Sequence, residues 1–88
     1  MGQQSKENLR LFMDALDEKS RRIFWHFRWH GHAKLSELVE LIGASSDMEV
    51  LSLLKEVINP IAMRFFDRLA LEFSESRWKL VPSRYYLG

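Results

Sequence analysis

The sequence predicts one mainly α-helical domain with a small β-hairpin near its C-terminus. Apolar residues recur at helical spacing along most of the 88 residues, and only four Gly and two Pro residues interrupt them, which favours helices over turns. Near the C-terminus, two short runs alternate apolar and polar residues around Ser74-Glu75-Ser76, the pattern of two paired strands. A chain of this length forms one domain, so we expect a single unit over residues 1–88.

Two helices are expected at the N-terminal end. The first covers about residues 5–16, with Ser5 as its N-cap. Four apolar residues share one face of it at helical spacing, namely Leu9, Phe12, Met13 and Leu16. Asp17 is the candidate cap of a second helix over residues 18–30, and one continuous helix through Asp17 is the alternative.

Glycine and serine residues divide the middle of the chain. Gly31 stands where a helix C-terminus takes a left-handed residue, so the second helix is expected to end before it. A short extended link from His32 leads to Ser36, the expected cap of a third helix over residues 37–42. Gly43 then ends this helix in the same way as Gly31.

A capping pattern opens the next helix. Ser46 is followed three residues later by Glu49, which forms a capping box for a helix to about residue 58. Asn59-Pro60 predicts a stop and a new start, because proline is tolerated in the first helical turn. A short helix to about Asp67 follows, and strands over residues 69–73 and 77–81 form the hairpin.

The middle of the chain reads LSELVELIGASSDMEVLSLLKEV, and LALEFSESRWKLV follows it near the C-terminus. With these two segments, the order of elements resembles a winged helix-turn-helix domain over roughly residues 17–82. The second segment stands in the wing position, and an extra N-terminal helix and a short C-terminal tail, residues 83–88, complete the chain. Two features depart from the family pattern: the turn is one residue longer, and residues 59–67 stand between the recognition helix and the wing. The resemblance implies a DNA-binding transcriptional regulator whose recognition helix enters the major groove.

The expected recognition helix, which follows Ser46 and ends at about residue 58, carries charges that fit duplex DNA poorly. Its outward face carries Glu49 and Glu56 beside a single cation, Lys55, whereas DNA affinity comes from neutralising phosphates. Two interpretations remain open: DNA contacts another surface, or the domain binds protein. The candidate nucleic-acid contacts are Ser46, Ser52, Lys55, Arg64, Arg68, Arg77 and Lys79. Ion pairing is the alternative interpretation for three of them: Arg64 with Asp67, and Arg77 or Lys79 with Glu72 across the hairpin.

The segment FWHFRWHGH raises the question of a metal or a docking site. His26 and His30 are four residues apart, as two helical metal ligands can be, but the segment lacks the further ligands of a zinc site. We therefore predict no metal and place these histidines at the edge of the helix's buried face. The chain also lacks paired carboxylates, a phosphate loop and a nucleophile elbow, so we predict no catalytic residues, no cofactor and no enzymatic activity.

The two tryptophans of this segment are expected on the opposite side of the helix from Phe27. A helix with two apolar faces needs two partners. The N-terminal helix is the expected cover for the second face, a second protomer is the alternative, and base stacking comes third. The predicted partner or dimer interface is therefore Trp25, Trp29, Leu9, Phe12 and Met13. A protein-interaction or dimerisation module is the alternative to DNA binding.

Overall fold

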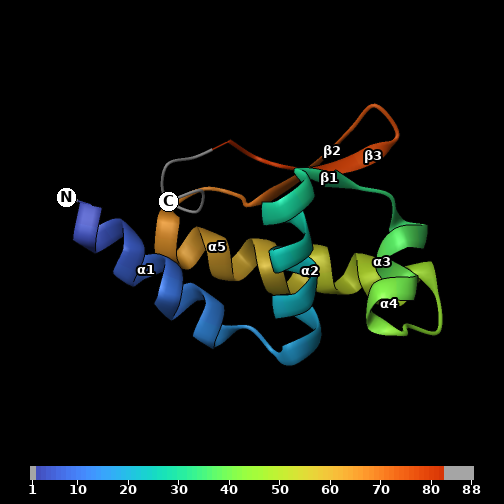
Figure 1. Cartoon of the computed structure of the whole chain (residues 1–88), viewed down its shortest axis with the longest axis horizontal. Coiled ribbons are helices and arrows are strands. Elements are labelled where there is room, and N and C mark those ends of the chain that lie inside the picture. The colour runs from blue at the N-terminus through green and yellow to red at the C-terminus, as the bar shows by residue number, and fades with distance from the viewer. Residues whose placement is uncertain (1, 83–88) are drawn as a thin grey trace.

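A computed structural model describes residues 2–82, with side chains from residue 7 onward. The helices of the N-terminal half are α1 (Gly2–Ala15), α2 (Glu18–His30) and α3 (Leu35–Ile42), with strand β1 (His32–Ala33) between the last two. Then come α4 (Asp47–Ser52), the π-helical η1 (Leu53–Ile58), α5 (Asn59–Phe66), and strands β2 (Leu71–Ser74) and β3 (Arg77–Leu80) (Figure 1). The expected fold class, mainly α with a small hairpin, is confirmed.

Most of the predicted helix boundaries are confirmed. α1 and α2 are separate, with Asp17 extended between them, and Gly31 and Gly43 end α2 and α3 in the left-handed region, with φ of 81° and 66°. The predicted cap Ser36 is wrong by two residues. Lys34 is the N-cap instead, because its carbonyl oxygen accepts the amides of residues 37 and 38 at 3.1 and 3.3 Å. α1 begins before Ser5, whose side chain lies outside the described residues, as does the predicted tail, residues 83–88.

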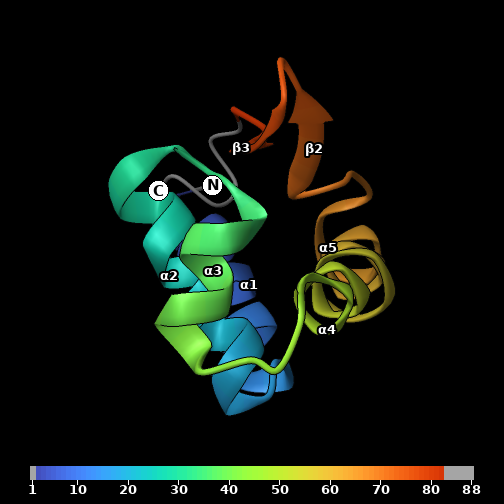
Figure 2. The ribbon, with the colours of Figure 1, turned by 90° about the vertical axis from the view of Figure 1, so that its right-hand side faces the viewer.

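The predicted stop at Asn59-Pro60 is wrong. Asn59 is helical, with φ −64° and ψ −44°, and the helix continues from α4 through η1 into α5. Figure 2 looks along this helix, with α4 in front of α5. In a π turn each amide bonds the carbonyl five residues earlier, as the amide of Asn59 does to Leu54. The backbone hydrogen bonds of the helix are thus shifted by one residue immediately before Pro60, whose nitrogen carries no hydrogen to donate. The segment that the sequence marked as a separate element is the end of one long helix.

The sheet has three antiparallel strands in the order β1-β3-β2, and Figure 2 shows it above two groups of helices, α2 with α3 and α4 with α5. The predicted hairpin is confirmed, and its turn residues Glu75 and Ser76 both have positive φ, as in a type I′ turn. β1 also joins the sheet, pairing Ala33 with Trp78, although the sequence predicted only an extended link there.

The residue alternation expected in the first strand of the hairpin is only partly correct. Leu71 is buried, but Leu69 and Phe73 are 47% and 62% exposed. Phe73 lies opposite Trp78 across the hairpin, with ring centroids 5.7 Å apart. Trp78 takes the buried place and is only 6% exposed, so Phe73, next to the turn, stays in solvent.

The core lies between α1, α2, the long helix and the inner side of the sheet. Phe12 of α1 is fully buried, with its ring edge-on to Phe24 at 4.8 Å and to Phe66 at 5.4 Å. α1 therefore packs into the core rather than lying on its outside. Among the described residues, no helix has both the length and the apolar character needed to cross a bilayer.

A buried asparagine fixes the hairpin to the long helix. The side-chain oxygen of Asn59 accepts the amides of Ala70 and Leu71 at 3.1 and 2.9 Å, and its Nδ2 donates to the carbonyl of Leu71 at 2.9 Å. The side chain thus satisfies three backbone groups at the start of β2. The sequence indicated a helix stop at this residue, and the structure gives it a positioning role that the local pattern did not reveal.

Candidate interaction surface on α2

The two faces of α2 have opposite environments. Ile23, Phe24 and Phe27 are fully buried, as the helical spacing predicted, whereas Trp25 is 49% and Trp29 77% exposed. The expectation that the N-terminal helix covers the two tryptophans is wrong, because α1 uses its own apolar face in the core. The tryptophans stand on the surface of the described structure.

The other members of the predicted interface behave differently from the tryptophans. Phe12 is fully buried and serves the core, so it offers no surface to a partner. Leu9 and Met13 are half-buried and pack against the same core. Only Trp25 and Trp29 of the predicted set remain as a candidate interface.

Two hollows flank the tryptophan pair. One, of about 220 Å³, is lined by Trp25, Arg28 and Trp29. The other, of about 330 Å³, lies toward α3. Both tryptophans line both hollows, so the two hollows adjoin at the tryptophan pair. We call this region the tryptophan surface, and it consists of Arg22, Trp25, His26, Arg28, Trp29, His30 and Leu41.

Arginines supply the charge of the tryptophan surface. The guanidinium of Arg28 lies 5.1 Å from the centre of the Trp25 ring, a cation–π arrangement. Arg22 lies 3.7 Å from the carboxylate of Glu18, and both side chains are exposed, so water and salt screen this pair. Arg22 and Arg28 thus place two cationic side chains beside the tryptophans.

His26 is less basic than an ordinary histidine. Burial lowers the pKa of His26, and the neighbouring His30, with its ring centroid 4.4 Å away, lowers the pKa further. The carboxylate of Glu37 opposes this shift, but it lies 3.9 Å from Nε2, too far for a hydrogen bond. His26 is therefore mostly neutral at neutral pH. Across residues 2–82, no group of three or more His, Cys, Asp or Glu side chains is placed to hold a metal ion.

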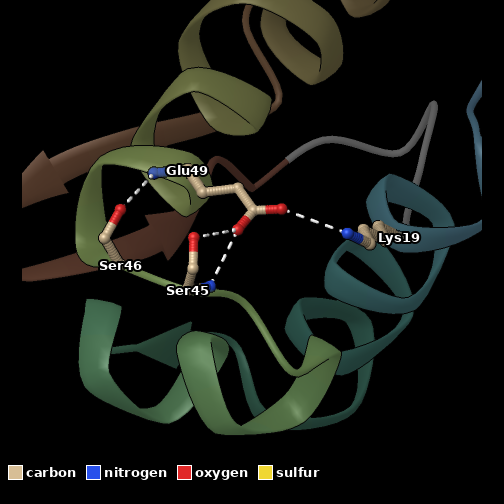
Figure 3. A network of polar contacts seen from close by, with 4 residues as sticks. All are labelled: Lys19, Ser45, Ser46 and Glu49. Atoms are coloured by element: carbon tan, nitrogen blue, oxygen red, sulfur yellow. Dashed lines mark hydrogen bonds and ion pairs between the residues drawn. The ribbon is translucent and has the colours of Figure 1, made fainter.

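The start of the predicted recognition helix is held by a polar network (Figure 3). The hydroxyl of Ser46 accepts the amide of Glu49 at 3.4 Å, which confirms the serine half of the capping box. The carboxylate of Glu49 accepts the amide and hydroxyl of Ser45, at 2.8 and 3.2 Å, rather than the amide of Ser46. Lys19 of α2 donates to the same carboxylate at 3.1 Å. The network ties α2 to the start of α4.

This network predicts an acid-sensitive contribution to stability. Hydrogen bonds from the amide of Ser45, from Lys19 and from the Ser45 hydroxyl lower the pKa of Glu49. Because the folded pKa is below the unfolded value, the stabilisation is complete above the ordinary pKa and is lost as the pH falls through the folded pKa. We expect the melting temperature, followed by circular dichroism, to fall more steeply on acidification in the wild type than in Glu49→Gln.

The matched control for this prediction is Glu40→Gln on the exposed surface of α3. This variant should keep the wild-type slope of melting temperature against pH. Parallel curves for the wild type and Glu49→Gln would contradict the assigned role of the network.

The predicted nucleic-acid contacts fall in separate regions. Ser46 caps α4, Ser52 donates to Glu56 at 3.3 Å, and Lys55 is exposed on η1. α5 forms the far end of the same long helix (Figure 1). Arg64 lies within α5 and Arg68 just beyond it.

The two predicted wing contacts lie on β3. Arg77 contacts Nδ1 of His32 at 3.3 Å. Lys79 lies opposite Glu72 in register, but it pairs with Glu75 at 3.1 Å. The predicted pairing of Lys79 with Glu72 across the hairpin is therefore wrong, because Lys79 pairs instead with the turn residue Glu75, four residues before it. The seven predicted residues do not gather at one place.

The sequence pattern understated the role of Leu41. Leu41 belongs to the segment that carries the family resemblance, yet it is 36% exposed and lines the larger hollow beside the tryptophans. It stands three residues after the buried Leu38, a spacing typical of one apolar face, so the local pattern gave no signal of its exposure. No family model, no curated protein and no solved structure matches this chain.

Proposed function

We propose that this chain is a winged-helix domain that acts as a protein-interaction module and docks its partner on the tryptophan surface. The order of elements supports the winged-helix assignment. α2, β1, α3 and the long helix are followed by the hairpin β2–β3, and β1 pairs with β3. This is the order that the sequence resemblance implies, with α1 as an addition.

The exposure of Trp25 and Trp29 carries the functional proposal. A fully buried large apolar side chain contributes about 1.5–3 kcal/mol relative to an exposed one, and this fold leaves most of that contribution unused at Trp29, which is 77% exposed. Tryptophan and arginine are the residues most enriched where binding energy concentrates in protein interfaces. Two tryptophans and two arginines around paired hollows therefore favour docking of a protein.

Binding of duplex DNA by the same domain is the second candidate. One observation favours it: Arg77 and Lys79 lie on β3 of the hairpin that occupies the wing position. Two observations place it second. Lys79 already pairs with Glu75, and along α4 and η1 the exposed cation Lys55 is accompanied by Asp47 and Glu56. Phosphate binding needs a surplus of cations there.

A selection from random peptides displayed on phage tests the proposed function. We expect peptides that bind the wild type to shift backbone amides between residues 22 and 41 and to lose binding to the Trp25→Ala, Trp29→Ala double variant. Phe73→Ala is the matched control, because Phe73 is also an exposed aromatic residue, 62% exposed, but lies on the hairpin. Peptides that bind the double variant as well as the wild type would contradict docking on the tryptophan surface.

Titration with nonspecific duplex DNA at low and high salt tests the second candidate with the same amide signals. Salt-sensitive shifts in residues 46–58, or at Arg77 and Lys79, would support DNA binding over protein docking. We expect these amides to stay unchanged, because the recognition-helix acids repel phosphate.

A further inference from the structure

We infer that the partner of the tryptophan surface is an acidic amphipathic helix, whose apolar side chains enter the two hollows and whose carboxylates pair with Arg22 and Arg28. This inference rests on the proposed function and names the chemistry of the partner. It follows from the shape of the surface, from its charge, and from the poorer fit of a second copy of the chain and of nucleic-acid bases.

The shape of the surface favours a partner with two neighbouring apolar side chains. Two hollows adjoin at Trp25 and Trp29, and both tryptophans line both of them. On a helix, residues three or four apart place their Cβ atoms about 5–6 Å from each other, and helices bound in grooves use apolar anchors at this spacing. One amphipathic helix can thus place an anchor in each hollow while it lies across the tryptophan pair.

The positive charge of the tryptophan surface favours a partner with carboxylate side chains. The charged side chains that line the hollows are Arg28 in the smaller and Arg22 in the larger, and both are cationic. The nearby acids, Glu18 beside Arg22 and Glu37 beside His26, line neither hollow. Because burial keeps His26 mostly neutral, the arginines dominate at neutral pH. Guanidinium groups bind carboxylates with two parallel hydrogen bonds, so acidic residues beside the apolar anchors complete the match.

A second copy of this chain fits less well. A two-fold contact places the same patch on both sides, so it would bring the arginines of the two copies into one interface. Like charges opposed across an interface are unfavourable. Nucleic-acid bases stack on open aromatic faces, and here Arg28 already lies over the Trp25 ring. Both occupants therefore become outcomes of the test.

The test compares two synthetic peptides of about 15 residues, near the length at which isolated helices become stable. Both carry Leu and Phe at helical spacing, with Glu at the remaining positions in one and Lys in the other. We expect the Glu peptide to shift amides of residues 22–30 and of Leu41, and its binding to weaken as salt rises. The Arg22→Glu, Arg28→Glu variant should weaken this binding about tenfold, which corresponds to about 1.4 kcal/mol, and should bind the Lys peptide more tightly than the wild type does.

The matched control is Arg10→Glu with Arg64→Glu, which makes the same change of net charge on α1 and α5, outside the tryptophan surface. It should leave the affinity for the Glu peptide within about twofold, as expected for distant exposed charges. Arg22→Glu alone is the milder variant, because its side chain is 60% exposed. It should show a smaller loss in the same direction.

The other outcomes would overturn the acidic partner, the proposed function, or both. Equal binding of the Lys peptide at the tryptophan surface would overturn the acidic partner and leave the proposed function standing. Shifts at the tryptophans with single-stranded oligothymidine and with neither peptide would overturn both. Concentration-dependent dimerisation that disappears in Trp25→Ala, Trp29→Ala would make a second copy the occupant and overturn the acidic helix.

Discussion

Replacing Asn59 with alanine is expected to lower the free energy of unfolding by about 3 kcal/mol or more. The variant leaves the amides of Ala70 and Leu71 and the carbonyl of Leu71 without the partner they have now. Ala70 and Leu71 are fully buried, and each buried polar group left unsatisfied costs about 1–3 kcal/mol. In a domain of this size, each kcal/mol lowers the melting temperature by roughly 4–8 °C. Chemical denaturation followed by circular dichroism measures the loss.

Hydrogen exchange localises the same effect. Because Asn59 bonds the first residue of β2, the amides of the hairpin should exchange faster in Asn59→Ala, beyond the change expected from the lower global stability. Asn8→Ala makes the same chemical change in α1, where the residue is half-buried, and should change stability by about 0.5 kcal/mol or less. Equal stability of the two variants would show that the hairpin does not depend on Asn59.

Replacing Phe12 with alanine is expected to cost about 3–5 kcal/mol, the usual loss for a fully buried phenylalanine. The ring packs edge-on against Phe24 of α2 and Phe66 of α5, so its removal opens a cavity where three helices meet. With a total stability of about 5–15 kcal/mol for a typical domain, such a loss leaves a large fraction of the protein unfolded at moderate temperature.

Two variants show whether α1 acts through the core or through the tryptophans. Leu11→Ala changes the residue before Phe12 in the chain, and Leu11 is 42% exposed. Trp29→Ala removes the most exposed tryptophan. Both should cost far less than Phe12→Ala, with Trp29→Ala within about 0.5 kcal/mol of wild type. A large loss in Trp29→Ala with a small one in Phe12→Ala would mean that α1 covers the tryptophan surface.

The proposals concern a surface that stability measurements do not reveal. Asn59 and Phe12 are expected to act on folding, whereas Trp25, Trp29, Arg22 and Arg28 are expected to act on binding with little effect on folding. The difference follows from burial, because the first two are at most 8% exposed and the tryptophans at least 49%. Variants of the tryptophan surface therefore remain usable in binding experiments.

The sequence by itself determined the features that depend on near neighbours. The spacing of apolar residues placed Phe24 and Phe27 on one side of α2 and the tryptophans on the other. Gly31 and Gly43 ended their helices because the left-handed conformation is easy for glycine. The alternating run around the turn at residues 75 and 76 identified the hairpin. Each of these patterns spans only a few residues, and local backbone preferences are enough to produce it.

Only the tertiary structure decided which surfaces meet. α1 had an apolar face and two available partners, and it packs into the core through Phe12 rather than on the tryptophans. Asn59-Pro60 favoured a helix stop locally, yet the helix continues through π turns before Pro60, and the Asn59 side chain makes three hydrogen bonds at the start of β2. Such outcomes depend on groups far apart in the chain, whose packing and hydrogen bonds outweigh local preference. For this reason the sequence could place Trp25 and Trp29 on a second face of α2, but only the folded molecule decided that α1 leaves them exposed.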